Sequence, residues 1–181
     1  MLTTKTKIDD VFIIEPKLYK DARGYFYESY NQKNFDSVLG NSLTFVQDNC
    51  SLSKKGVLRG LHYQLPPFAQ AKLVSCVLGE IYDVAVDIRR KSATYGQWVG
   101  AILNEENMKQ MWIPEGFAHG FIVLSETAKV VYKTNCHYMA SHESTIKWDD
   151  PDLNIYWPFE GRLLLSEKDR KGVSFRDAVK F

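Results

Sequence analysis

The chain has 181 residues, of which 45% are hydrophobic and 13% aromatic, and this supplies enough apolar surface to bury the core of one domain. Its 23 basic and 22 acidic side chains nearly cancel, so it lacks the bulk positive field that attracts nucleic acid or an anionic membrane surface. Any anionic ligand must therefore be held by a few placed residues.

Targeting signals and paired cysteines are missing from the sequence pattern. The N-terminal residues contain no apolar stretch of the length that a secretory signal needs, and no later segment stays apolar for a membrane span. Cys50, Cys76 and Cys136 are odd in number, widely separated and form no CxxC pair, which argues against a disulfide framework or a zinc knuckle. We expect a cytoplasmic protein with reduced thiols and no membrane or nucleic-acid partner.

Short segments rich in Val, Ile, Tyr and Phe recur along the chain with turn residues between them, and this pattern predicts antiparallel strands. The predicted strands are 11–14, 25–30, 43–47, 57–64, 72–78, 81–88, 98–103, 108–113, 117–124 and 129–138. Only 31–39 and the tail from Ser166, which can cap a short turn, look helical. The sequence predicts an all-β sandwich or barrel with short peripheral helices, forming a single domain over 1–181.

Strand alternation gives the first indication of a site. Along 129–138 the even positions place Tyr132 and Tyr138 on one face. In the segment 57–64, however, Arg59 and His62 are three residues apart and should face opposite ways. They can serve one site only if Gly60 hosts a bulge that re-aims one of them.

A metal site is a candidate that the sequence disfavours. The spacing Pro-x-Gly-x-x-His, which ends at His119, is similar to the second half of the cupin metal motif. The first half should supply a His-x-His pair, but this chain has His62 followed by Tyr63 and Gln64. Two histidines are too few for a catalytic iron, zinc or manganese site, so we expect no metal.

The ionisable side chains that remain are suited to proton transfer, and each also has a structural interpretation. His62 is a candidate base, whose tautomer either Asp83 or Asp169 can fix, but it equally fits a hydrogen-bonded structural histidine. Lys72 begins a strand, where solvent exposure is the simpler interpretation, and Tyr132 fits a packing residue with a wet hydroxyl.

Candidate ligand-binding groups lie elsewhere in the chain. Arg23 and Arg59 each stand beside a glycine, and arginine forks suit phosphate oxygens, although surface arginines are common. The run Gln47-Asp48-Asn49 carries hydrogen-bonding groups that can read a base or sugar edge, although Asp48 and Asn49 equally fit a turn.

Several motifs, taken together, resemble the dTDP-4-dehydrorhamnose 3,5-epimerase family. They are Arg-Gly-Tyr-Phe-Tyr-Glu at 23–28, Gln-Asp-Asn at 47–49, Leu-Arg-Gly-Leu-His-Tyr-Gln at 58–64, the segment 82–89, the segment 112–121 and Ser-Glu-Lys-Asp at 166–169. The resemblance implies a dimeric cupin that inverts carbons 3 and 5 of dTDP-4-dehydro-6-deoxy-glucose without a metal or organic cofactor. Its product would feed rhamnose and surface-polysaccharide synthesis.

Residue by residue, the resemblance implies that His62 is the general base paired with Asp169, that Tyr132 is the acid on the opposite face, and that Lys72 is the cation beside the ketone oxygen. The positions implied to contact the sugar nucleotide are Arg23, Phe26, Glu28, Gln47, Asn49, Arg59, Lys72, His119, Glu143 and Lys168, with Tyr138 stacked on the thymine. In such dimers the N-terminal strand region completes the neighbour's site, so Arg23 and Glu28 are expected to act across the interface.

The chain departs from many members of the family at Cys50 and Leu52, where a histidine and a basic residue are expected. This departure bears on contacts near the nucleotide end. Three rival functions remain open: a sibling that inverts only carbon 3 or only carbon 5, a metal-dependent cupin oxygenase or isomerase using His62 and His119, and a non-catalytic cupin that senses a sugar nucleotide or polysaccharide.

Overall fold

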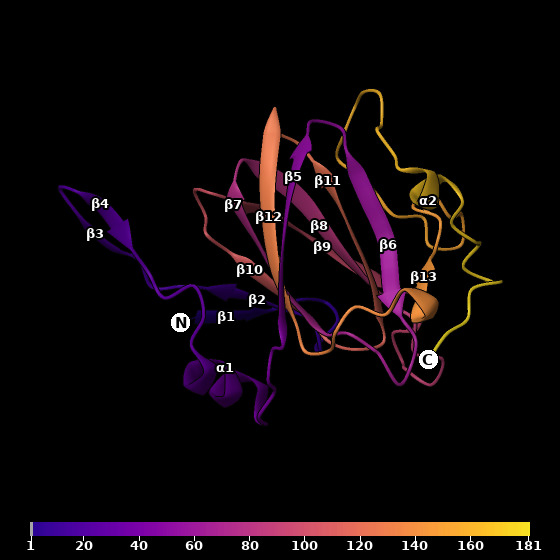
Figure 1. Ribbon diagram of the computed structural model, residues 1–181, viewed down its shortest axis with the longest axis horizontal. Coiled ribbons are helices and arrows are strands. Elements are labelled where there is room, and N and C mark those ends of the chain that lie inside the picture. The colour runs from indigo at the N-terminus through magenta and orange to yellow at the C-terminus, as the bar shows by residue number, and fades with distance from the viewer. Residues whose placement is uncertain (1) are drawn as a thin grey trace.

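The computed structural model describes residues 2–181, which form two antiparallel sheets facing each other (Figure 1). The six-stranded sheet has the order β1 (Leu2–Lys5), β2 (Phe12–Glu15), β10 (Gln110–Ile113), β7 (Lys72–Leu78), β12 (Thr127–Thr134) and β5 (Gln47–Lys54). The five-stranded sheet has the order β13 (Glu143–Thr145), β6 (Leu58–Gln64), β11 (Phe117–Val123), β8 (Glu80–Asp87) and β9 (Trp98–Asn104).

The main core lies between the two sheets and takes alternate residues from each. Val74 of β7 and Val130 of β12 meet Ala85 of β8 and Phe121 of β11 in one cluster of buried side chains. Such alternation is what a period of two along each strand produces when one face is buried. Tyr132 shares the inner face of β12 with Val130 and packs partly against the same cluster.

The outer face of the five-stranded sheet is also covered, which explains why every residue of β11 is buried. Leu61 and Val84 pack there against Ile146, Leu153 and Phe175 of the C-terminal third of the chain. In Figure 1 this C-terminal segment, drawn in yellow, runs beside β6. The packing brings the short helix α2 (Glu167–Arg170) next to β6.

The remaining elements lie outside the two sheets. Asn31 caps α1 (Gln32–Leu39) by accepting a hydrogen bond from the backbone of Asn34, and Gly40 ends the helix in a left-handed conformation. The hairpin of β3 (Tyr19–Asp21) and β4 (Gly24–Phe26) extends away from the sheets (Figure 1), and a 3₁₀ turn, η1 (Ala140–His142), precedes β13. Within residues 2–181 no helix is long and apolar enough to cross a membrane.

The predicted all-β sandwich or barrel with short peripheral helices is confirmed, but β1, β3 and β13 were not predicted and several strand boundaries are wrong. The strand predicted over 25–30 ends at Phe26. The segment 43–47 is irregular up to Val46, and β5 starts only at Gln47. The strand predicted over 129–138 ends at Thr134, where the Thr134 hydroxyl turns to the carbonyl of Cys136. Tyr138 therefore lies in the following loop, and strand parity does not govern where it points.

Candidate active site

His62 and Asp169 form the tightest polar pair between β6 and α2. His62 Nε2 lies 2.6 Å from Asp169 Oδ1, and the side chains are 24% and 3% exposed. A carboxylate can only accept, so Nε2 carries the proton that it donates to Asp169. In the described part of the chain Nδ1 of His62 makes no hydrogen bond, so this nitrogen keeps a free lone pair.

A bulge at Gly60 aims His62 and Arg59 to the same side, as the sequence required. Where β6 pairs with β11, His62 lies opposite His119 and Arg59 lies opposite Phe121. A step of three residues along β6 therefore matches a step of two along β11. The extra residue falls at Gly60, whose φ of +128° favours glycine. A Cβ added there would stand 2.6 Å from the Cα of Gly120, so the close approach of the two backbones also requires glycine.

Asp169 is held by the helix cap that Ser166 provides. The Ser166 hydroxyl accepts the backbone N–H of Asp169 at 3.1 Å and donates to Asp169 Oδ2 at 2.5 Å, and the backbone N–H of Gly60 donates to Oδ1. Burial alone would raise the pKa of Asp169, but the hydrogen bonds from His62 and Ser166 lower it to about 2. Asp169 is therefore a carboxylate throughout the neutral range.

Burial is also the main influence on His62, and it lowers the pKa of the imidazole. The hydrogen bond to Asp169 opposes this shift, while the positive charge of Lys168 adds to it. A histidine with a lowered pKa is neutral at neutral pH and is ready to accept a proton.

A second histidine–aspartate pair lies beside the first. His119 Nε2 donates to Asp83 Oδ1 at 2.8 Å, and both side chains are buried. His119 Nδ1 then faces the ammonium of Lys72, 3.5 Å away. Asp83 thus partners His119, and Asp169 partners His62, which decides between the two carboxylates that the sequence left open.

Lys72 bridges the two sheets. The interpretation as a solvent-exposed strand-start lysine is wrong, because Lys72 is only 8% exposed. Its ammonium lies near His119 of the five-stranded sheet and 6.0 Å from the ring centre of Tyr132 on its own sheet. Burial lowers the pKa of Lys72 to about 8, and the negative charges of Asp83 and Glu143 oppose that shift.

Tyr132 lies across the cluster from His62, on the opposite sheet. Its neighbours in register are Val74 of β7 and Asn49 of β5. Burial raises the pKa of its phenol, although the charge of Arg59 opposes that effect. Tyr132 therefore stays protonated at neutral pH and can act as a proton donor.

A chain of charged and polar groups continues from this cluster towards the surface. Glu143 accepts hydrogen bonds from Lys168 Nζ at 2.7 Å and from the Tyr138 hydroxyl at 2.8 Å. Burial alone would raise the pKa of Glu143, but these two hydrogen bonds lower it. The backbone N–H of Tyr138 donates to Gln47 Oε1, so the half-exposed Tyr138 ring is tied to the start of β5.

Residues 47–49 belong to β5, so the turn interpretation of Asp48 and Asn49 is wrong. Gln47 and Asn49 lie on the less exposed face of the strand and are joined by a hydrogen bond of 2.9 Å. Cys50 and Leu52 alternate with them and are exposed on the other face. The departure from the family pattern at these two positions thus faces away from Asn49.

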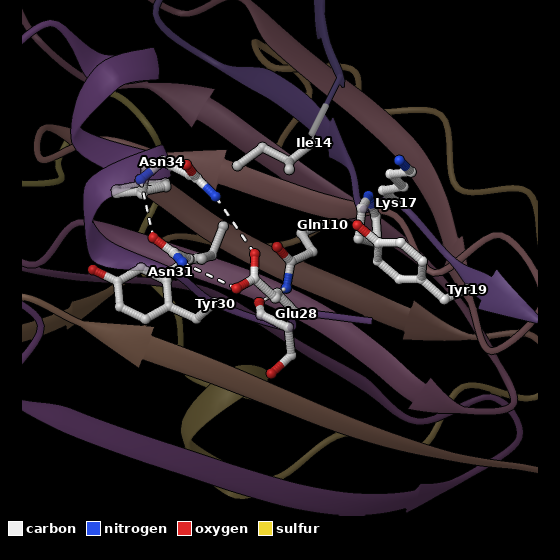
Figure 2. Close-up of a pocket in the computed structure, with 12 residues that line it drawn as sticks. Ile14, Lys17, Tyr19, Glu28, Tyr30, Asn31, Asn34 and Gln110 are labelled. Carbon is white, nitrogen blue, oxygen red and sulfur yellow. Dashed lines mark hydrogen bonds between the residues drawn. The ribbon is translucent and has the colours of Figure 1, made fainter. Parts of the chain in front are cut away.

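Three of the predicted contact residues do not join the cluster within one chain. Arg23 lies in the projecting β3–β4 hairpin, where it pairs with Asp21, and Phe26 is exposed on the same hairpin. Figure 2 shows Glu28 in a different cavity, of about 160 Å³, with its carboxylate directed towards Asn31 and Asn34.

Three supporting residues carried no role in the sequence interpretation. Ser166 donates to the buried carboxylate of Asp169, although it was noted only as a helix cap. Ser53 accepts a hydrogen bond from Arg59 Nε at 3.1 Å. Gln64 is buried and holds the loop of Tyr138 through the backbone of residues 137 and 139. The Gln64 contacts join segments distant in the chain, so no local pattern reveals them. The Ser166–Asp169 contact is local, and the helix-cap motif could have indicated it.

Residues 2–181 contain no group of three or more His, Cys, Asp or Glu side chains arranged to hold a metal ion. His62 and His119 are instead each engaged by a separate aspartate. The assembled chemistry is that of a neutral imidazole on one sheet, a protonated phenol on the other, and a buried ammonium between them. Such a set can remove a proton from one side of a molecule, return one from the other side and stabilise an intervening oxyanion.

Comparisons with known proteins agree with the sequence motifs. A family model described as dTDP-4-dehydrorhamnose 3,5-epimerase matches residues 5–177. The enzyme of that name from Shigella flexneri is 58% identical over 181 residues, which cover 100% of this chain and 99% of that one, and the one from Pseudomonas aeruginosa is 56% identical over 98% of both. The structure of dTDP-6-deoxy-D-glucose-3,5-epimerase from Legionella pneumophila in complex with dTDP-4-keto-L-rhamnose has a TM-score of 0.95 at 51% identity, covering 97% of this chain and 93% of that one.

Proposed function

Because this chain belongs to the dTDP-4-dehydrorhamnose 3,5-epimerase family, we propose that the cluster around His62, Lys72 and Tyr132 carries out that family's reaction. The chain is an isomerase that inverts carbons 3 and 5 of dTDP-4-dehydro-6-deoxy-glucose, and its product supplies dTDP-rhamnose synthesis. The observation that carries the assignment of residues is the placement of His62 and Tyr132 on opposite sheets with Lys72 between them.

The substrate's own chemistry explains why these residue types are needed. Carbons 3 and 5 both flank the ketone at carbon 4, so removal of either proton gives an enolate. The enolate forms readily only where its oxygen meets a preorganised positive charge or hydrogen-bond donor. The buried ammonium of Lys72 is suited to that task, because a charge acts more strongly in a site from which water is excluded.

Inversion requires two proton-transfer groups on opposite faces of the sugar ring. A single residue that removed and returned the proton would restore the starting configuration. We assign His62 Nδ1 as the base, because Nε2 is engaged by Asp169, and the Tyr132 phenol as the acid on the other face. No electrons leave the substrate overall, so the reaction needs no redox cofactor.

The dTDP moiety would extend from this cluster towards the surface. Arg59 and Lys168 supply positive charge for the diphosphate, and the neutral His119 lines the site beside Lys72. Gln47, Asn49 and Glu143 supply hydrogen-bonding groups, and the exposed ring of Tyr138 is free to stack on the thymine.

A homodimer would account for the residues that the single chain leaves outside the cluster. Arg23 and Phe26 are exposed on the projecting hairpin, and Glu28 follows them closely. We propose that this segment enters the neighbouring protomer's site, where Arg23 would meet the diphosphate. Mixing Arg23→Ala and His62→Asn protomers tests it: random exchange should restore about a quarter of wild-type activity, because each heterodimer regains one intact site. Activity that stays absent after exchange would contradict the swap.

Solvent deuterium exchange tests the assignment of base and acid. His62→Asn should abolish deuterium uptake from heavy water at both carbons. Tyr132→Phe should leave some exchange while preventing completion of the inverted configuration, because the base still works and the returning proton has no donor. Full activity of the His62 variant would overturn the assignment of the base.

The same experiment separates the rival functions. Uptake of deuterium at two carbons indicates the double epimerase, and uptake at one carbon indicates a single-centre epimerase. Tight binding of the sugar nucleotide without any exchange would indicate a sensor. The domain organisation over 1–181 and a cytoplasmic location remain predictions, which limited proteolysis and cell fractionation would test.

A further inference from the structure

Asp83 is a buried charge to which the proposed reaction gives no task. Its side chain is completely buried on β8, where Oδ1 accepts the His119 hydrogen bond. Within residues 2–181 its second oxygen, Oδ2, has no hydrogen-bond partner. Buried carboxylates are normally fully hydrogen-bonded or paired with a cation, so this arrangement needs an explanation.

The nearby cation is Lys72, and a neutral imidazole separates it from Asp83. Lys72 Nζ lies 3.5 Å from His119 Nδ1, on the opposite side of the ring from Asp83. In the part of the chain that the structure describes, the ammonium makes no direct ion pair with Asp83. The three side chains thus form a line of ammonium, imidazole and carboxylate that joins β7 to β11 and β8.

From this geometry we propose that Asp83 is a positioning residue that acts through His119: it supplies the counter-charge that keeps Lys72 protonated, while the interposed imidazole keeps the ammonium free for the substrate. A direct ion pair would occupy the donors of Lys72 and cancel much of its field at the ketone oxygen. A carboxylate on the far side of the imidazole stabilises the positive charge without competing with the ketone oxygen for the N–H donors of the ammonium. The proposal rests on the role proposed above for Lys72.

The other groups that face Lys72 do not replace Asp83 in this task. His62 and His119 are neutral, and Tyr132 is a neutral phenol. Glu143 also raises the pKa of Lys72, but its carboxylate is engaged by Lys168, whose own charge acts in the opposite direction. Asp83 has the strongest effect of any charge that favours protonated Lys72.

The direct test is to titrate Lys72 itself in the complete, substrate-free protein. Lysine labelled with ¹³C at Cε gives one NMR signal per side chain, and Lys72→Met identifies the signal of interest. In the wild type this signal should titrate at about 8. Asp83→Asn should lower the midpoint so that proton binding weakens by about tenfold, because the negative charge that most favours protonated Lys72 is lost. An unchanged midpoint in Asp83→Asn would overturn the proposal.

Two further variants separate charge from packing. Asp150→Asn is the matched control, because Asp150 is also a buried aspartate, engaged with the backbone of Phe175. It should leave the Lys72 midpoint unchanged. Asp83→Glu keeps the carboxylate and lengthens the side chain, so it should retain the midpoint within about threefold in proton affinity while kcat falls. If the Lys72 midpoint were as low in Asp83→Glu as in Asp83→Asn, packing, and not charge, would set the protonation of Lys72.

Two measurements distinguish failure of the counter-charge role of Asp83 from failure of the role proposed for Lys72. If Lys72→Met turned over at the wild-type rate, Lys72 would not be the enolate-stabilising cation, whatever its titration showed. If Lys72→Met were inactive but Asp83→Asn left the midpoint unchanged, the catalytic role would stand and the counter-charge role of Asp83 would fall. With both proposals correct, the fall of kcat/KM at high pH moves to lower pH in Asp83→Asn.

Discussion

Replacing Asp169 by asparagine removes one charge from the active site and replaces Oδ2, which accepts the Ser166 hydroxyl, by an amide donor. Asn is nearly isosteric, and its Oδ1 can still accept the hydrogen bonds from His62 Nε2 and the backbone of Gly60. What His62 loses is the negative charge behind the imidazole. Asp169→Asn therefore tests whether that charge, beyond the orientation of the ring, helps His62 to take a proton.

The magnitude follows from the pKa of Asp169, which is lowered from 3.8 to about 2 mainly through its bonds to His62 and Ser166. A displacement of nearly two units corresponds to about 2 kcal/mol of interaction with the ionised carboxylate. Burial opposes these bonds, so the net shift gives only the order of magnitude of the interaction, and we take the stabilisation of protonated His62 to be about 2 kcal/mol. Proton abstraction in Asp169→Asn should therefore slow by up to about 30-fold, and not by the many orders expected for His62→Asn.

The assay is deuterium uptake from heavy water into carbons 3 and 5 of the substrate, followed by NMR at saturating substrate. Asp152→Asn is the control, because Asp152 makes a surface ion pair with Arg176 and should have no effect. Circular dichroism checks that the fold is retained. A rate equal to wild type in a folded Asp169→Asn would refute the argument that the carboxylate supports the base, and so would a loss as complete as that of His62→Asn.

Three further outcomes are expected. Gly60→Ala should destabilise the fold by roughly 2–4 kcal/mol in urea unfolding, because its Cβ would meet Gly120. The control Gly24→Ala, at a similar φ of +127° but with open space around it, should cost about 1 kcal/mol. Equal losses in the two variants would contradict the close-approach argument. The plot of kcat/KM against pH should rise below 6.5 as His62 loses its proton and fall through about 8 as Lys72 loses its own, and a profile that is flat above pH 7 would argue against Lys72. The pKa of Asp169 is lowered in the fold, so its ionised carboxylate stabilises the folded state by about 2 kcal/mol above pH 4, and this is lost as pH falls towards 2. The free energy of unfolding of Asp169→Asn should therefore depend less on pH in that range.

The sequence alone was enough to predict the class of fold and most of the strands. Their alternation and turn residues are local properties, and β6 and β7 lie where that pattern places them. The need for a bulge at Gly60 was also visible, because Arg59 and His62 had to share a face across an odd spacing, and the register shift confirms it. The family motifs, which are themselves local strings, were sufficient to indicate the reaction.

Only the tertiary structure decided which carboxylate partners which histidine. Asp169 reaches His62 across 107 residues because the C-terminal segment packs on the outside of β6, and Asp83 reaches His119 through strand pairing. The burial of Lys72 was likewise invisible, since a lysine at a strand start is usually exposed and only the facing sheet excludes water from it. Protonation states depend on burial and on charges brought together from distant segments, which no local spacing contains.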